Sequence, residues 1–327
     1  MFEKYDMKKL LVIVLIIAVL FALSGCSPTV ELEEYTNNNL PSIDFMQPWA
    51  FCTKSAEELS TQFEKLKAKG IDTVIIQNTA KYYNGEPLEC YFDSQYDFPK
   101  KHSDFFKNVM SAAGDVGIKI IVGTCFDDYW WKYLLHSYND KVMQMFYEEE
   151  VKLLEEILTK YDVQGVYYAN EMFSNPMRYE KQWSAHINKI CDFLNNRSQK
   201  LPLYLSPFTS NAFLQSNNSV ARMWARFFTD TNLRQGDMFI LQDGFGNLPS
   251  QPTTQQSEQV YKLDKLIRDT CLQYSQADFA LNIEFFSKDG YASWDRMRLQ
   301  TDYANKLGNV IACFTVSHYF IDSEQWL

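Results

Sequence analysis

Two glutamates stand at the ends of apolar segments, and this position favours acid–base chemistry. The stretch GVYYANE (165–171) is typical of a buried strand that stops at an amide and a carboxylate, Asn170 and Glu171. A second apolar run, FALNIE, ends on Glu284. Two carboxyl groups about 5 Å apart hydrolyse a glycosidic bond with retention, one as acid/base and one as nucleophile. The alternative is structural: Glu171 begins a helix, and Glu284 pairs with a base such as Lys288.

The two roles need opposite environments. Burial among Tyr and Trp raises the pKa of an acid/base, whereas hydrogen bonds to its charged form keep a nucleophilic carboxylate ionised. The residue types by themselves leave open which of the two glutamates takes which role.

The elements that carry these residues follow a regular alternation. Eight apolar runs are unbroken rather than alternating, which is typical of strands covered on both faces. They span residues 43–49, 72–77, 118–125, 163–169, 203–206, 238–242, 279–284 and 310–315. Amphipathic segments lie between them, as where Leu59, Phe63 and Leu66 share one helical face.

Local signals agree with this alternation. Ser55 and Glu58 form a capping box at the start of the first helix, and Gly117 lies where a helix should end. Eight strands alternating with helices over about 270 residues predict a single (β/α)₈ TIM barrel in the α/β class. A doubly wound open sheet is the alternative, because periodicity does not give strand order.

A barrel gathers its functional residues at the carboxyl ends of the strands. Flat aromatic rings with amides and carboxylates suit a polyhydroxylated ring, which stacks on its apolar face and bonds at its edge. Besides Glu171 and Glu284, the strand ends supply the predicted substrate-binding residues Gln47, Trp49, Gln77, Asn78, Trp130, Trp131, Asn170, Gln242, Asp243, His318 and Tyr319.

The two glutamates end strands four and seven. This pattern resembles the clan A glycoside hydrolases, which are retaining enzymes on a (β/α)₈ barrel. The resemblance implies that Glu171 is the acid/base, that Glu284 is the nucleophile and that Asn170 binds the sugar 2-hydroxyl. Clan A members commonly carry an Arg near the end of strand two, a Tyr near strand six and a Trp ending strand eight. This chain departs from all three.

Over most of its length, the chain resembles more closely a bacterial barrel family, domain of unknown function 4434. The resembling stretches are FMQPW, GIDTVIIQ, the WW after strand three, GVYYANE, LYLSPF, ILQDGFG and FFSKDG. That resemblance implies a glycosidase-like barrel without assigning a substrate.

Two further classes of function compete with a glycosidase. A non-catalytic glycan-binding lipoprotein would need only the stacking aromatics. A metal-dependent hydrolase would use Asp127, Asp128, Asp243 and His318, although Asp127 and Asp128 are more typical of a turn cap. The retaining mechanism needs no cofactor and no metal. The acidic run 148–150 is typical of a solvated helix face.

The first 26 residues predict export. Lys8 and Lys9 precede a short apolar run, and the sequence LSGC ending at Cys26 resembles a bacterial lipobox. An uncleaved anchor helix is the alternative. We expect a signal peptide (1–26), a polar tether (27–40) and a barrel domain (41–327). The lipidated Cys26 would anchor the protein in the bacterial membrane, facing outside the cytoplasm.

The net charge of the chain restricts the classes of molecule that it can bind. The net charge of −10 argues against nucleic acid, which binds mainly to Lys and Arg. The sequence thus predicts an exported glycoside hydrolase-like enzyme that acts on extracellular glycans.

Overall fold

The predicted strands form a closed parallel barrel in the computed structural model, which describes residues 38–130, 140–172, 180–209, 217–288, 290–308, 310–324 and 327. These residues all belong to one compact unit. Around the barrel the strand order is β1-β14-β11-β10-β9-β8-β6-β2, and β1 pairs with β2 to close it. The barrel strands are β1 (Ile43–Met46), β2 (Thr73–Ile76), β6 (Lys119–Gly123), β8 (Gly165–Tyr168), β9 (Leu203–Leu205), β10 (Met238–Gln242), β11 (Asp278–Glu284) and β14 (Ile311–Phe314).

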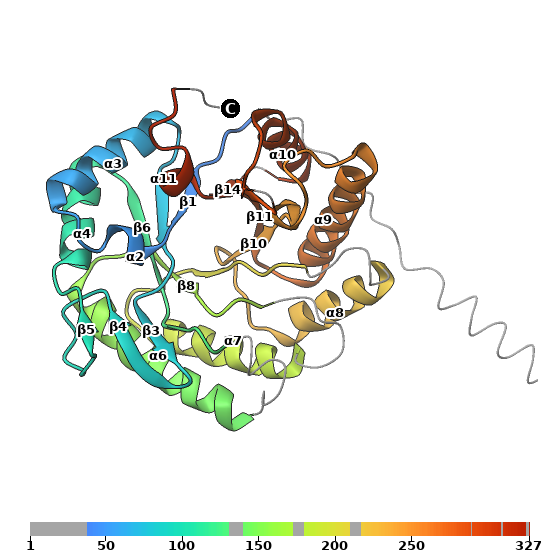
Figure 1. Ribbon diagram of the computed structural model, residues 1–327. Coiled ribbons are helices and arrows are strands. Elements are labelled where there is room, and N and C mark those ends of the chain that lie inside the picture. Colours follow the sequence, from blue (N-terminus) through green and yellow to red (C-terminus); the bar gives the residue numbers. More distant parts are fainter. Residues whose placement is uncertain are drawn as a thin grey trace, which may run out of the picture. The chain divides into compact units, whose positions relative to one another are not determined.

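Helices surround this barrel (Figure 1). They are α2 (Pro48–Phe51), α3 (Ala56–Ala68), α4 (Phe105–Val116), α6 (Asp140–Lys160), α7 (Glu180–Asn195), α8 (Asn217–Asp230), α9 (Thr254–Tyr274), α10 (Trp294–Leu307) and α11 (Val316–Tyr319), with a 3₁₀ turn η1 (Phe245–Asn247). The TIM barrel prediction is confirmed, and the open-sheet alternative is wrong because the strands close. Among the described residues, no helix has the length and apolar character needed to cross a membrane.

Local sequence explains the element boundaries. Ser55 accepts from the backbone N–H of Glu58, whose carboxylate accepts from the N–H of Ser55, so the capping box forms as predicted. Gly117 ends α4 with φ of 75°, a left-handed conformation that costs glycine little. The last strand stops at Phe314, and the residues expected at its end, Ser317 to Tyr319, belong to α11 instead.

Two small sheets were not predicted. Strands β3 (Ala80–Tyr83), β4 (Glu86–Cys90), β5 (Lys100–Lys101) and β7 (Phe126–Asp127) form a sheet in the order β5-β4-β3-β7. Strands β12 (Phe286–Ser287) and β13 (Gly290–Tyr291) form a hairpin. Both insertions follow carboxyl ends of barrel strands, so they belong to the face where a barrel carries its site.

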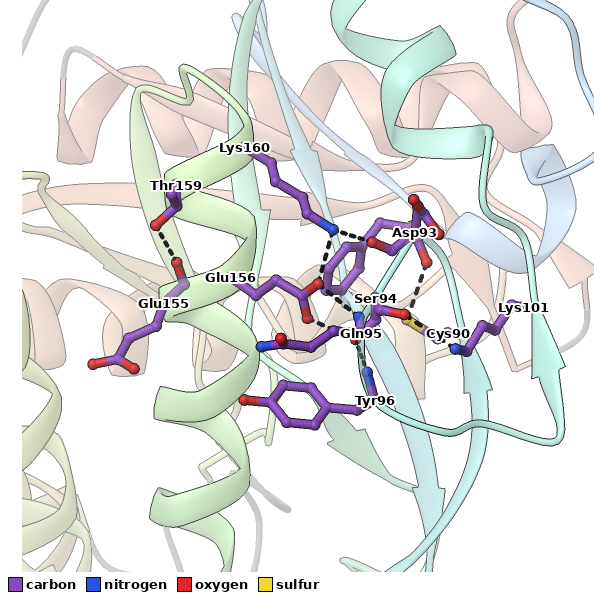
Figure 2. A network of polar contacts seen from close by, with 11 residues as sticks. Cys90, Asp93, Ser94, Gln95, Tyr96, Lys101, Glu155, Glu156, Thr159 and Lys160 are labelled. Atoms are coloured by element: carbon purple, nitrogen blue, oxygen red, sulfur yellow. Dashed lines mark hydrogen bonds and ion pairs between the residues drawn. The ribbon is translucent and has the colours of Figure 1, made fainter.

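A buried carboxylate ties the larger insertion to the barrel wall. Glu156 of α6 accepts from the hydroxyl of Ser94 and the backbone N–H of Gln95, each at 2.7 Å, and pairs with Lys160 at 2.8 Å (Figure 2). Burial raises the pKa of Glu156, but the hydrogen bonds from Lys160, Ser94 and Gln95 outweigh it and lower that pKa. The segment between β4 and β5 is therefore fixed against α6.

Candidate active site

Register decides which side chains reach the mouth of the barrel. Tyr167 and Ala169, Ile240 and Ala280 belong to one cluster of inward-facing residues inside the barrel. Side chains that are an even number of positions apart lie on the same side of a strand. Glu171 follows Ala169 by two positions, Gln242 follows Ile240 by two, and Glu284 follows Ala280 by four, so all three face inward. The fourth and seventh strands of the barrel thus each deliver one glutamate to the mouth.

Glu171 has the environment of a proton donor. Its Oε1 accepts a hydrogen bond from the side-chain amide of Gln242 at 3.2 Å. Burial raises the pKa of Glu171 to about 6, and the bond from Gln242 partly offsets that rise. The indole N–H of Trp130 donates to the backbone carbonyl of Glu171 at 2.8 Å and fixes the end of this strand.

Glu284 lies in a closed environment shared with Asp243. The two side chains are 4% and 1% exposed. Oε2 of Glu284 accepts from the backbone N–H of Gly246 at 2.6 Å. Burial, reinforced by the charge of Asp243, raises the pKa of Glu284 well above its ordinary value. Burial also raises the pKa of Asp243 to about 6, against hydrogen bonds from Gln300 and Phe245 that lower it.

Burial thus disfavours the carboxylate form of both groups, and the charge of Asp243 raises the pKa of Glu284 further. This differs from the expectation for Glu284, which as a nucleophile was to stay ionised. Negative charge on the pair is balanced by Arg296, 3% exposed, whose guanidinium donates to the backbone carbonyls of Glu284 and Phe286 and to the side chain of Gln300. Gln300 in turn donates to Oδ2 of Asp243 at 2.6 Å.

Sequence reasoning missed Arg296 and Gln300. They lie four residues apart on α10 and so share one helical face, which is the signal that the sequence offered. No periodicity shows that this face packs against the end of β11. The pairing of Glu284 with Lys288, considered from the sequence, is replaced by contacts to Gly246 and Asp243.

Asn170 faces away from the mouth. It is fully buried; its amide donates to Oε1 of Glu150 and to the carbonyl of Cys125, both at 3.1 Å, and its Oδ1 accepts from the N–H of Asp127. Glu150 is itself 0% exposed, and its Oε2 lies 2.7 Å from Nε2 of His186. The prediction of a solvated face for 148–150 is therefore wrong at Glu150.

The aromatic residues divide between buried and exposed. Trp130 is 0% exposed and packs edge-on against Phe146, so the predicted stacking surface does not fit this residue; Trp130 supports Glu171 instead. Trp131 lies outside the described residues. Trp49 is 57% exposed on α2, with its ring 5.7 Å from that of His318. Trp49 thus retains the accessible face that stacking on a sugar requires.

His318 is held as a neutral ring. Its Nε2 accepts from the backbone N–H of Gln47 at 3.2 Å, and burial lowers its pKa to about 4. The rings of Trp49, Phe51 and Tyr319 surround it. Tyr319 is half-buried and also contacts the ring of Tyr291, which is 64% exposed.

The amides predicted at strand two have different surroundings. Gln77 is half-buried and follows the inward-facing Ile75 by two positions, so it points toward the mouth. Asn78 is 5% exposed and donates to the carbonyl of Ala80 at 3.3 Å. Gln77 is available to a ligand in this arrangement, whereas Asn78 is occupied by the chain itself.

The aspartates that were considered as metal ligands make separate contacts with the protein. Asp127 accepts from the backbone N–H groups of Asn84, Gly85 and Tyr129, which makes it the turn cap that the sequence favoured. Asp128 pairs with Lys81 at 3.1 Å. Within the described part of the chain, no three His, Cys, Asp or Glu side chains are arranged to hold a metal ion.

Comparison with known proteins identifies the family of the chain. Residues 45–325 match the family described as a domain of unknown function, DUF4434. The chain belongs to the DUF4434 family. A comparison of this DUF4434 chain with curated proteins finds no match.

Among solved structures, the chain is similar to a "putative alpha-L-fucosidase" from Bacteroides thetaiotaomicron, with a TM-score of 0.65, 17% identity and coverage of 90% of this chain and 91% of that one. A more distant likeness is to an intracellular xylanase from Thermoanaerobacterium saccharolyticum, with a TM-score of 0.48, 11% identity and coverage of 85% and 90%. At these identities the first likeness shows a common fold for the DUF4434 chain.

Proposed function

We propose that the protein is a glycoside hydrolase that cleaves extracellular glycans by a retaining mechanism. The observation that carries the proposal is the link between the two glutamates. Gln242 bonds to Glu171, while the next residue, Asp243, interacts with Glu284 and raises its pKa. Two consecutive residues of one strand end thus connect the carboxyls of strands four and seven. Similarity of fold to the fucosidase-like protein is consistent with this reaction class.

The chemistry follows from the protonation of the two groups. Glu171, when protonated, donates its proton to the glycosidic oxygen, and the carboxylate of Glu284 attacks the anomeric carbon. The bond to the leaving oxygen breaks as the glycosyl ester forms. Glu171, now a carboxylate, removes a proton from water, and the resulting attack releases the sugar and Glu284. The attacking form of Glu284 is its carboxylate, and the hydrogen bond from the backbone N–H of Gly246 stabilises that form.

The test is a screen of aryl glycosides, including α-L-fucosides, and of polysaccharides with the wild type, Glu171→Gln and Glu284→Gln. We expect hydrolysis by the wild type and its loss in both variants, with NMR of the released sugar showing retained anomeric configuration. Hydrolysis that persists unchanged in Glu284→Gln would remove this residue from the mechanism. Net inversion would show that water, rather than Glu284, attacks the sugar.

A second function is favoured by one observation. Burial and the charge of Asp243 raise the pKa of Glu284, which disfavours the carboxylate form that would attack carbon. A glycan-binding lipoprotein on the same barrel would use the exposed ring of Trp49 and the amides of Gln47 and Gln242. It would bind oligosaccharides in calorimetry while leaving every glycoside of the screen intact, whereas the hydrolase cleaves at least one.

The location outside the cytoplasm belongs to the same proposal. It rests on Cys26 and on the basic and apolar segment before it, which lie outside the described residues. We expect lipid labelling and detergent-phase partitioning of the full chain, both lost in Cys26→Ser. Equal partitioning of the two proteins would contradict anchoring through this cysteine.

A further inference from the structure

A cavity of about 310 Å³ lies beside the mouth, between the end of β10, the η1 turn and α9. Figure 1 shows α9 on the outside of the barrel, where it packs next to β11. Gln242 and Asp243 form part of its wall, so the cavity adjoins the residues that bond to Glu171 and couple to Glu284. No step of the proposed hydrolysis uses the other side chains that line it.

Asp264 of α9 is the most unusual group in this wall. Its side chain is 4% exposed and lines the cavity, and it has neither a hydrogen bond nor an ion pair to any described residue. Burial, together with the charges of Asp243 and Glu284, raises its pKa well above the ordinary value. A buried polar group without a partner destabilises a fold by roughly 1–3 kcal/mol. Ordered water or a ligand in the cavity can supply the partner that the described residues do not.

A second polar group in the wall has the same property. The hydroxyl of Thr209, which follows β9, is buried and makes no hydrogen bond to any described residue. The amides of Gln242, Asn247 and Gln256 add donors and acceptors to the wall. Leu248, Pro249 and Val260 supply an apolar side. Polar edges facing an apolar side match the two surfaces of a sugar ring.

The volume of the cavity and the charges in its wall restrict the class of ligand further. The volume is at the lower end of the range for ligand pockets, roughly 300–1,000 Å³, which fits one sugar unit. The ammonium of Lys288 also lines the cavity and disfavours a cationic amino sugar, while the carboxyl of Asp264 can hydrogen-bond to a sugar hydroxyl in either protonation state. We propose that this cavity is a subsite for one neutral sugar unit, in which Asp264 and Thr209 bind its hydroxyl groups. This inference rests on the proposed function only in taking a glycan as the ligand.

The experiment measures binding and hydrolysis separately on the purified full chain. Ligand-observed NMR titrations use glucose, galactose, mannose, xylose, fucose, N-acetylglucosamine and glucosamine as probes. The variants are Asp264→Leu, Asp264→Asn and Thr209→Val, with Asp302→Asn, an exposed acid on α10, as the matched control. Thermal unfolding checks each fold, and we expect Asp264→Leu to unfold no earlier than the wild type because it removes a buried acid without a partner.

We expect at least one neutral sugar to bind the wild type and Asp302→Asn equally. Asp264→Leu should weaken that binding about tenfold or more, the effect of losing a buried hydrogen bond, while Asp264→Asn retains part of it. Absence of binding by every probe, equal binding to Asp264→Leu, or preference for glucosamine would each overturn the subsite. Binding that depends on Asp264 without hydrolysis of any glycoside would leave the subsite standing and refute the hydrolase. Hydrolysis by Asp264→Leu with an unchanged KM would refute the subsite and leave the hydrolase standing.

Discussion

The backbone N–H of Gly246 lies 2.6 Å from Oε2 of Glu284 and donates a hydrogen bond to it. This contact requires glycine. A Cβ built on residue 246 would lie 2.4 Å from the ring of Phe286 and 2.9 Å from the same carboxyl oxygen. The η1 turn can therefore cover Glu284 only while position 246 has no side chain.

Gly246→Ala should consequently impair catalysis. The added methyl displaces either the turn or the carboxyl, and a displacement of about 1 Å at a reacting group costs about 100-fold in rate. We expect kcat on a cleaved aryl glycoside to fall by about that factor, with KM less affected.

Gly114→Ala is the matched control for that substitution. Gly114 lies within α4, its Cβ would meet no atom within 4 Å, and alanine favours a helix over glycine by about 1 kcal/mol. Urea unfolding should show a gain in stability of that order with unchanged kcat. Equal activity of the two variants would mean that the contact of Gly246 with Glu284 is unimportant for catalysis.

The amide of Gln242 sets the protonation of Glu171. Its hydrogen bond favours the carboxylate and lowers a pKa that burial raises to about 6. Gln242→Leu removes the donor, so the pKa of Glu171 should rise. A general acid works only while protonated, hence the alkaline limb of the pH profile of kcat/KM should move to higher pH. A limb that moves to lower pH, or stays in place, would exclude Glu171 as the acid.

Asp243 acts on the other limb. Its charge raises the pKa of Glu284, and a nucleophile works only while ionised. Asp243→Asn removes that charge, so the acidic limb of kcat/KM should move to lower pH. Retained binding of the substrate, measured in Glu171→Gln and Glu171→Gln/Asp243→Asn, would show that the substitution leaves the site assembled. An acidic limb displaced to higher pH would show that Asp243 stabilises the carboxylate of Glu284.

Sequence patterns were sufficient for the barrel because each strand is an unbroken apolar run with helical periods between. The larger of the two small sheets was not predicted because apolar and polar residues alternate only weakly along β3 and β4, and β5 consists only of Lys100–Lys101. Strand ends also identified the acids at the mouth. Alternation along the strand then separates Glu171 from Asn170, and this separation could have been read from the sequence.

Contacts made by helices could not be read in that way. Asp264 reaches the cavity from α9, and Arg296 reaches Glu284 from α10. Which face of a helix meets which strand depends on how the helices pack in three dimensions, and amphipathic periodicity gives only the average apolar face. A charged residue that packing buries has the same place in the sequence pattern as a charged residue on the surface, so the pattern does not identify it.

Glu150 shows the energetic consequence of such a burial. Its carboxylate accepts from Asn170 and lies 2.7 Å from Nε2 of His186, with no exposed surface. Glu150→Ala would leave His186 and Asn170 buried without this partner, and a buried polar group that loses its hydrogen-bond partner costs about 1–3 kcal/mol. We expect that loss in urea unfolding. Glu148→Ala, two residues away on the exposed face of α6, should change stability by less than about 0.5 kcal/mol. Similar losses in both variants would mean that the acidic run acts as a whole on α6, rather than through the contacts of Glu150.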